Sequence, residues 1–216
     1  MSPTPERGIW IRDPAGRHDL AVFADRARVL DEAAVIRLRT RADGLLGAWV
    51  GTGFDVLAGR AVAGTVLPAD LTCAAEELAR GLRSADTDGY ADPGYPLDSA
   101  WRGALPPETG FVHVDDVPAG VLADLAISGA DLAREAAGHG PPASLLDQDV
   151  LHVSGNGSEV GVPMRCVLAL AAMRFMPEAP PEAELVRIRL SPTWLRIDAR
   201  FGSVFRRRGG PALLIR

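Results

Sequence analysis

Residues 35–50 read VIRLRTRADGLLGAWV and decide the fold class. From Val35 to Arg41, apolar and polar side chains largely alternate, which is the period of a β-strand with one buried face. Asp43-Gly44 follows, a pair that favours a hairpin turn because glycine accepts a positive φ. Leu45–Val50 is apolar again. The stretch therefore predicts two antiparallel strands joined by a tight turn.

The residues after this hairpin predict the rest of an N-terminal unit. Phe54–Leu57 and Arg60–Leu67 are expected to form further strands, which Pro68 ends. A helix is predicted from Ala69 to Leu82, because its leucines recur at helical spacing while its glutamates lie on another face. We therefore expect residues 1–83 to form a mainly antiparallel β unit with one helix at its end.

Residues 84–109 have the composition of a loop, rich in proline, glycine and aspartate. They are either a linker between two units or a packed functional loop. Tyr90, Tyr95 and Trp101 argue against a fully solvated linker, because aromatic side chains normally pack against other groups.

A mixed α+β unit is predicted for residues 110–216. The patterns predict, in order, a strand at Phe111–Asp115, a helix after Pro118 that Gly129 can split, a short helix near Ala143–Asp147, a hairpin of Val150–Ser154 and Glu159–Val162, an apolar helix after Pro163, and strands at Leu185–Leu190, Trp194–Arg200 and Val204–Arg208. Cys166, Leu170 and Met173 are expected on the buried side of the helix after Pro163. The fold class is therefore α+β.

Two segments of the chain resemble each other. Residues 32–39 (EAAVIRLR) and 182–189 (EAELVRIR) agree in residue class at nearly every position. A duplication would produce this agreement, and so would independent convergence of two strands that each expose arginine. The sequence leaves both readings open.

Composition restricts the class of protein. The chain has 216 residues, 47% of them hydrophobic, and a formal charge of −5, which is ordinary for a globular protein. All 23 basic residues are arginine, which indicates a GC-rich bacterial genome and excludes mechanisms that need lysine. No apolar stretch approaches the roughly 20 residues of a membrane span, and the N-terminus lacks the layout of a signal peptide. We therefore expect a cytoplasmic protein without a membrane partner.

Charge is distributed unevenly along the chain. Residues 84–160 carry thirteen acidic residues and two arginines, whereas residues 184–216 carry eight arginines and two acidic residues. The predicted strands place arginines on shared faces, and the candidate binding residues are Arg187, Arg189, Arg196 and Arg200. Either these arginines form a binding face for an acidic protein partner, or the acidic middle of the chain covers them, or they form a merely solvated strand face.

Catalytic motifs are absent from the sequence. His113 and Asp115 share a strand face, and His152 would join them if its strand paired with theirs, but no CxxC, HxxxH or HExxH motif supports a metal site. Gly51-Thr52-Gly53 lacks the third glycine and the following helix of a dinucleotide loop. We therefore expect no catalytic residue, no metal and no cofactor.

The sequence favours a non-enzymatic interaction or regulatory protein that contacts an acidic partner. A nucleic-acid or nucleotide-binding module that uses the arginine strands is the alternative, and a small metal-dependent enzyme around His113, Asp115 and His152 is the second alternative. Residues 118–162 also follow the element order of a winged helix, but the segment expected as the third helix carries aspartates and no arginine, so its charge argues against DNA binding there. The oligomeric state is not encoded in any pattern found.

Overall fold

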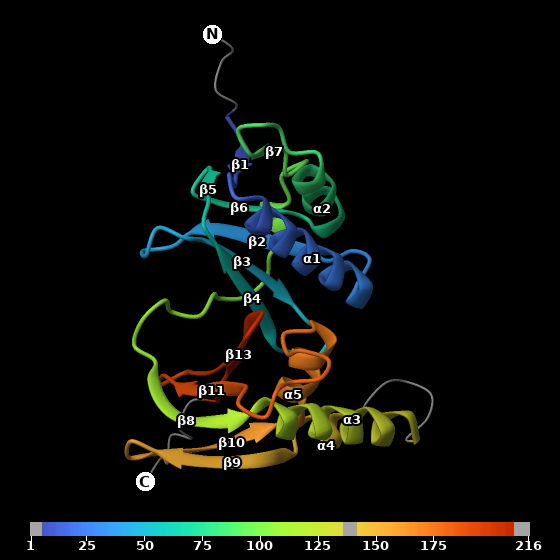
Figure 1. Ribbon diagram of the computed structural model, residues 1–216, viewed down its shortest axis with the longest axis vertical. Coiled ribbons are helices and arrows are strands. Elements are labelled where there is room, and N and C mark those ends of the chain that lie inside the picture. The colour runs from blue at the N-terminus through green and yellow to red at the C-terminus, as the bar shows by residue number, and fades with distance from the viewer. Residues whose placement is uncertain (1–5, 136–141, 210–216) are drawn as a thin grey trace. The chain divides into compact units, whose positions relative to one another are not determined.

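The computed structural model describes residues 6–135 and 142–209 (Figure 1). The described residues form helices and mostly antiparallel sheets, so the predicted α+β class is confirmed. The chain divides into two compact units. Unit 1 comprises Met1–Gly53 and Gly59–Glu108, and unit 2 comprises Phe54–Ala58 and Thr109–Arg216. Among the described residues, no helix is both long enough and apolar enough to cross a membrane.

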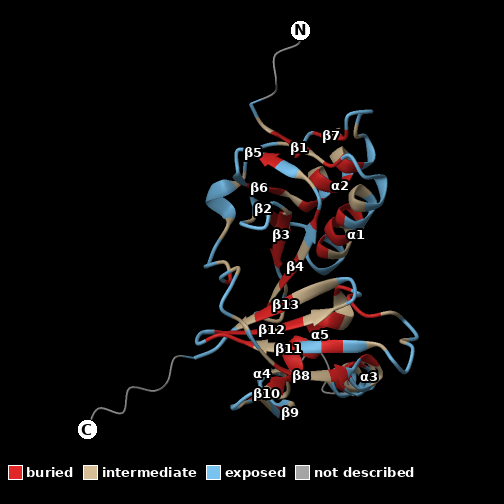
Figure 2. Ribbon diagram, turned by 60° about the vertical axis from the view of Figure 1, so that its left-hand side comes forward, coloured by how far each residue is buried: buried red, intermediate tan, exposed pale blue. Residues whose placement is uncertain are grey.

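Unit 1 combines helices with an antiparallel sheet. The elements from residue 6 to 108 are β1 (Gly8–Trp10), α1 (Pro14–Leu30), β2 (Val35–Thr40), β3 (Leu46–Gly51), β4 (Leu57–Val62), β5 (Thr65–Leu67), β6 (Asp70–Ala74), α2 (Ala75–Arg83), β7 (Tyr90–Ala91) and a 3-10 turn, η1 (Asp98–Ala100). The main strand order is β6-β2-β3-β4, and β5-β1-β7 form a small second sheet. Leu20 of α1, Ile36 and Leu38 of β2 and Leu78 of α2 are fully buried and form the core (Figure 2).

The predicted hairpin at residues 35–50 is confirmed. β2 and β3 pair antiparallel, with Ile36 opposite Val50 and Thr40 opposite Leu46. Gly44 has a φ of +80°, which is the conformation that its turn requires.

The helix predicted at Ala69–Leu82 begins six residues later in the structure. Asp70–Ala74 form β6, which pairs antiparallel with β2, and α2 starts only at Ala75. Leucine spacing does not distinguish a strand that leads into a helix from the helix itself. Residues 70–74 form a strand because pairing with β2 provides hydrogen-bond partners for their backbone N–H and C=O groups.

Unit 1 also contains a helix that the sequence patterns did not predict, α1. Asp13 caps it by accepting hydrogen bonds from the N–H groups of Ala15 and Gly16, and Pro14 occupies its first position. Alanines make up much of its buried side, so its hydrophobic periodicity is weak. The Asp-Pro pair is the signal that could have located the start of this helix.

Unit 2 contains the second set of predicted elements. They are β8 (Val112–Pro118), α3 (Ala119–Glu135), α4 (Ala143–Leu146), β9 (Asp149–Gly155), β10 (Ser158–Pro163), α5 (Met164–Ala172), β11 (Leu185–Leu190), β12 (Trp194–Ala199) and β13 (Gly202–Arg207). Strands β13-β12-β11-β8 are neighbours in that order, and β9 and β10 form a separate hairpin. The expected burial of Cys166, Leu170 and Met173 is confirmed, since each is at most 2% exposed.

Gly129 does not split α3. A Cβ at this position would contact the side chain of Met164 in α5. Glycine therefore allows α3 to approach α5 closely, and its role is in packing rather than in ending the helix.

The two similar segments adopt similar local structures. Residues 32–39 and 182–189 each begin in a turn closed by a backbone hydrogen bond, from Ala34 N–H to Asp31 C=O and from Glu184 N–H to Pro181 C=O, both 2.9 Å long. Each then enters the first strand of a three-strand meander, β2-β3-β4 or β11-β12-β13. The agreement in sequence is therefore accompanied by agreement in local structure.

Residues 84–108 pack against the sheet of unit 1. The N–H of Leu97 donates to the carbonyl of Thr72 in β6, and a carboxylate oxygen of Asp98 accepts from the N–H of Thr72. Glu108 accepts from the N–H of Ala42, in the turn between β2 and β3. The segment therefore covers backbone groups at the outer edge of β6.

Gly81→Ala is expected to lower the free energy of unfolding by about 1–3 kcal/mol, although alanine is the better helix former by about 1 kcal/mol. A Cβ at residue 81 of α2 would overlap the carbonyl oxygen of Asp92, and a backbone atom cannot turn aside as a side chain can. Urea denaturation measures the change.

Gly120→Ala is the matched control, because nothing lies within 4 Å of the added Cβ at this position in α3. This variant should be neutral or slightly stabilising. Equal effects of the two substitutions would contradict the close packing of α2 against residue 92.

Candidate functional site

The candidate arginines lie on and beside two neighbouring strands of unit 2. Arg189 of β11 is directly opposite Arg196 of β12, and Arg187 is opposite Asp198. Their neighbours Ile188 and Ile197 are fully buried, so the arginine side chains occupy the other side of the sheet. Arg200 lies in the turn after β12. We call Arg187, Arg189, Arg196 and Arg200 the arginine face.

Carboxylates of the same unit contact every residue of the arginine face. Asp198 lies 2.7 Å from Arg196 Nε and 3.3 Å from Arg189 Nε, Asp116 of β8 lies 3.3 Å from Arg187 Nε, and Glu184 lies 3.0 Å from Arg200 Nη1. Four guanidinium groups thus meet three carboxylates, which leaves a formal charge of +1. Of these three carboxylates, only Asp116 belongs to the acidic stretch of residues 84–160. That stretch therefore pairs with the arginine face only at Arg187.

Asp116 also contacts His113, whose Nε2 lies 3.1 Å from the carboxylate. Burial acts to raise the pKa of Asp116, but the hydrogen bond with His113 and the charge of Arg187 together hold that pKa below its ordinary value. Asp116 therefore stays ionised near neutral pH, and it pairs with Arg187 as a full charge.

Two aromatic rings flank Arg196. Its guanidinium carbon lies 5.5 Å from the ring centroid of Phe111 and 5.5 Å from that of Phe205, and the two rings are 6.3 Å apart in an edge-on arrangement. These contacts add cation–π attraction to the ion pair with Asp198. Arg196 is consequently the most firmly held residue of the arginine face, with a side chain only 19% exposed.

Hydrogen-bond donors remain on this face. The ion pairs of Arg187, Arg189 and Arg196 use Nε, and no described residue accepts a hydrogen bond from their Nη groups. The side chains of Arg187 and Arg200 are 55% and 53% exposed. The arrangement can therefore donate further hydrogen bonds to carboxylates from outside the chain.

The residues of the metal hypothesis are not brought together as a ligand set. His113 contacts Asp116 rather than Asp115, and His152 is exposed on β9, opposite Gly161 of β10. Across residues 6–135 and 142–209, no group of three or more His, Cys, Asp or Glu side chains is arranged to hold a metal ion.

Both cysteines are free and buried. Burial raises the pKa of Cys73 to about 12 and that of Cys166 to about 12. Neither thiol therefore forms a thiolate nucleophile near neutral pH.

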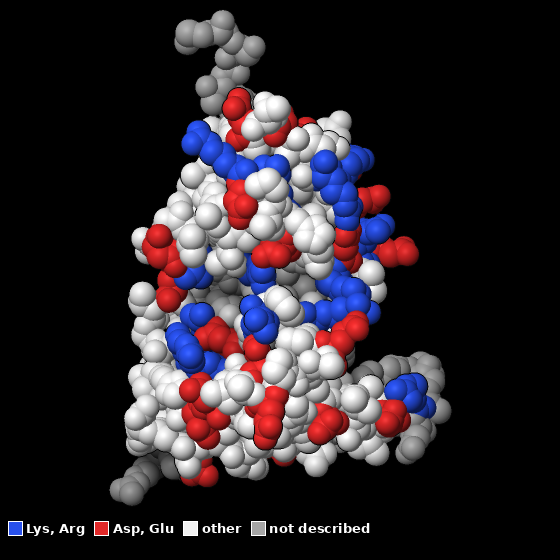
Figure 3. Space-filling view, viewed as in Figure 1, with Lys and Arg blue, Asp and Glu red and all other residues white. Residues whose placement is uncertain are grey.

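Sequence reasoning missed a pocket of about 330 Å³ in unit 1. It is lined by Arg37, Asp70, Thr72, Asp98, Trp101 and Gly103. The only sequence signal for it was Trp101, an aromatic residue inside a loop-like segment. Figure 3 shows acidic and basic side chains interspersed over the visible face rather than gathered in one broad cationic surface.

Family comparisons match the two halves of the chain separately. Residues 4–103 match a family described as a domain of unknown function (DUF8010), and residues 106–211 match a second family with the same description (DUF8185). No curated protein matches the chain.

Solved structures resemble the chain over nearly its whole length. They include DNA polymerase sliding clamps from Bacillus subtilis (12% identity, TM-score 0.56, 97% of this chain and 67% of the clamp) and Caulobacter crescentus (16%, 0.55, 96% and 66%). The DNA polymerase III beta subunit from Pseudomonas aeruginosa also matches (15%, 0.53, 94% and 66%). The chain thus spans about two thirds of the length of these proteins. At such identities the likeness shows the fold, which is sliding-clamp-like.

Proposed function

We propose that this chain is a non-enzymatic binding protein that uses a sliding-clamp-like fold to present the arginine face to an acidic protein partner. The observation that carries the proposal is the set of Nη donors on Arg187, Arg189 and Arg196, which no residue of the described ranges accepts from, while carboxylates form ion pairs with their Nε atoms. A preordered guanidinium loses less freedom when it binds a carboxylate than a mobile one does.

The charge of the arginine face favours a protein over a nucleic acid as the partner. Affinity for nucleic acid depends on neutralising many phosphates, whereas this face carries a formal charge of only +1 and three carboxylates of its own. An acidic protein can place single carboxylates opposite single guanidinium groups. The likeness to DNA polymerase sliding clamps makes nucleic-acid binding the second candidate function.

The non-enzymatic part of the proposal rests on the chemistry of the described side chains. The two thiols are buried with raised pKa values, and His113 is held by Asp116 at the edge of an ion-pair network rather than beside a nucleophile. These groups fit a scaffold better than an active site.

Arg187→Ser/Arg189→Ser is expected to abolish or strongly weaken binding of an acidic polypeptide. Poly-glutamate serves as the probe, and isothermal titration at about 50 mM and about 200 mM salt measures the affinity. We expect binding by the unaltered chain that falls with salt and a loss of at least about tenfold in the variant. Single-stranded RNA and duplex DNA, measured in the same way, should not bind.

Arg28→Ser/Arg80→Ser removes the same charge from exposed positions on α1 and α2 of unit 1 and is the matched control. It should bind poly-glutamate as the unaltered chain does. Salt-sensitive nucleic-acid binding that the Arg187/Arg189 variant loses would replace the proposal with the second candidate. Absence of binding to all three probes would show that the arginine face is only a solvated surface.

A further inference from the structure

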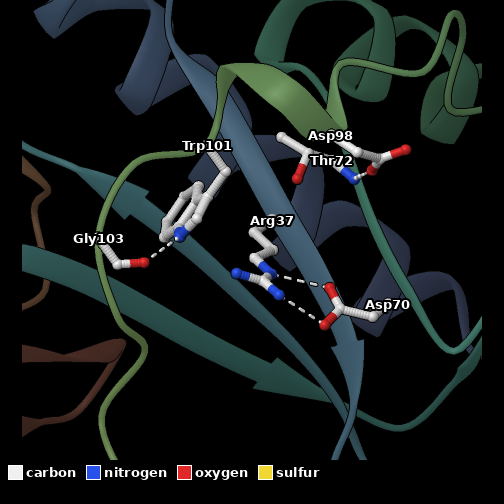
Figure 4. A pocket seen from close by; sticks show the side chains of 6 residues that line it. All are labelled: Arg37, Asp70, Thr72, Asp98, Trp101 and Gly103. Carbon is white, nitrogen blue, oxygen red and sulfur yellow. Dashed lines mark hydrogen bonds and ion pairs between the residues drawn. The ribbon is translucent and has the colours of Figure 1, made fainter.

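The pocket of unit 1 lies between the sheet and the loop that crosses it (Figure 4). Arg37 projects from β2, and Asp70 and Thr72 belong to β6. Asp98 begins the 3-10 turn η1 within the crossing loop, and Trp101 directly follows that turn. In this view the Trp101 ring lies on one side of Arg37, and Asp70 and Asp98 lie on the other side. The indole ring of Trp101 and the carboxylates of Asp70 and Asp98 thus line the same pocket.

The loop that forms the pocket wall is held by backbone and side-chain hydrogen bonds. Leu97 N–H donates to Thr72 C=O over 2.9 Å, Asp98 Oδ1 accepts from Thr72 N–H over 2.6 Å, and Trp101 Nε1 donates to Gly103 C=O over 3.0 Å. The indole and the Asp98 carboxylate are therefore in position before any ligand arrives. Such preorganisation reduces the entropy that binding costs.

The cation already present in the pocket is neutralised. Arg37 binds Asp70 through two hydrogen bonds, Nε to Oδ1 at 2.8 Å and Nη2 to Oδ2 at 2.7 Å. The hydrogen bond with Asp70, partly offset by burial, raises the pKa of Arg37, so the pair stays charged on both sides. Because both oxygens of Asp70 accept hydrogen bonds from Arg37, Asp98 is the pocket carboxylate that can still accept a hydrogen bond from a ligand.

Asp98 keeps one oxygen for a ligand. Its Oδ2 is 4.0 Å from Arg7 Nη1 and accepts no hydrogen bond from a described residue. Arg7 directs its other nitrogens to the carbonyls of Thr72 and Gly94. The Asp98 side chain is 57% exposed, so a ligand from solvent can reach it.

We propose that this pocket binds the guanidinium group of an arginine side chain in a partner peptide. Such a group would hydrogen-bond to Asp98 Oδ2 and lie against the Trp101 ring, which already contacts the Arg37 guanidinium at 5.9 Å. An anionic ligand would instead meet the free Asp98 Oδ2 and two arginines, Arg37 and Arg7, that Asp70 and Asp98 already pair. The ligand is therefore a cation.

A neighbouring residue favours a peptide over a free small cation. Tyr95 belongs to the same loop, three residues before Asp98, and is 85% exposed. An exposed tyrosine on the segment that also carries Asp98 and Trp101 can provide apolar contact for the residues next to a bound arginine. The two surfaces are independent, because this pocket recognises a cation in unit 1 whereas the arginine face recognises carboxylates in unit 2.

Blocked pentapeptides of the form Gly-Gly-X-Gly-Gly test the proposal, with X as arginine, citrulline or glutamate. Citrulline keeps the shape of arginine without its charge. The indole N–H signals of the ¹⁵N-labelled full chain report binding, and Trp101→Phe assigns the signal of Trp101. We expect the arginine peptide to shift this signal saturably with a Kd of about 1 mM, and the other two peptides to leave it unchanged.

Asp98→Asn is the decisive variant, because asparagine retains an oxygen that accepts from Thr72 N–H while the charge is lost. Binding of the arginine peptide should weaken at least about fivefold. Asp43→Asn removes a carboxylate from an exposed ion pair of the same unit and should leave binding unchanged. Unaltered thermal unfolding of Asp98→Asn would confirm that its fold is intact.

Equal shifts by the arginine and citrulline peptides, or no saturable shift up to about 10 mM, would overturn the proposal. Retained binding in Asp98→Asn would overturn it as well. The Arg187→Ser/Arg189→Ser chain should bind the arginine peptide normally, so failure of the proposed function and failure of this inference give different results.

Discussion

Leu170→Ala is expected to lower the free energy of unfolding by about 2–5 kcal/mol. Leu170 is fully buried, with a relative exposure of 0%, and every residue of α5 from Met164 to Leu170 is buried. Truncation to alanine removes apolar contacts and leaves a cavity that close-packed neighbours fill only in part. Urea denaturation followed by circular dichroism measures the shift in midpoint.

Ile127→Ala on α3 is the control for this prediction. Ile127 is 62% exposed, so its truncation removes little buried surface and should change stability by less than about 0.5 kcal/mol. A change well under about 1 kcal/mol for Leu170→Ala would mean that α5 does not form the core of unit 2.

Arg165→Met is expected to lower the free energy of unfolding by about 2–4 kcal/mol. Arg165 is 8% exposed, and its Nη groups donate to the carbonyl of Phe54 at 2.7 Å and to Asp147 at 2.6 Å. Methionine keeps the apolar stem but removes both charge-assisted hydrogen bonds. Denaturation midpoints at two salt concentrations measure the effect, which should persist at high salt because the donor side is buried.

Asp147→Asn separates charge from hydrogen bonding at this pair. Asparagine still offers an oxygen to Arg165, and the Asp147 side chain is 55% exposed, so this variant should cost less than Arg165→Met. A stabilised Arg165→Met chain would contradict the prediction. It would show that desolvation of the guanidinium, whose Nε has no hydrogen-bond partner among the described residues, exceeds the gain from its two contacts.

The arginine face shows how far a strand pattern predicts a binding surface. Alternation placed Arg187 and Arg189 on one side of a strand, and the structure confirms that placement through the buried Val186 and Ile188. The alternation could not show that Asp198 lies within 3.3 Å of Arg189, because that contact depends on the register between β11 and β12. Use of the face for binding stays a prediction.

The pocket could not be predicted from any local pattern. Arg37 and Asp70 are 33 positions apart in sequence, and Trp101 comes from a third segment. Pairing of β2 with β6 brings the first two together, with Arg37 opposite Thr72 and Arg39 opposite Asp70. The loop then adds Trp101 through hydrogen bonds to the edge of β6.

The sequence by itself determined the α+β class, the hairpin at residues 35–50 and the burial of the helix after Pro163. These features follow from the spacing of apolar residues within a short segment. The hydrophobic effect favours burying the apolar face of such a segment wherever the segment lies in the fold. Only the tertiary structure decided that Asp70–Ala74 is a strand, that carboxylates of unit 2 pair with the arginine face, and that Trp101 lines a pocket. Each of these features depends on strand register or on contacts between segments that are distant in sequence. Backbone hydrogen bonds and ion pairs form between groups that are close in space, and their spacing along the chain does not reveal which groups these are.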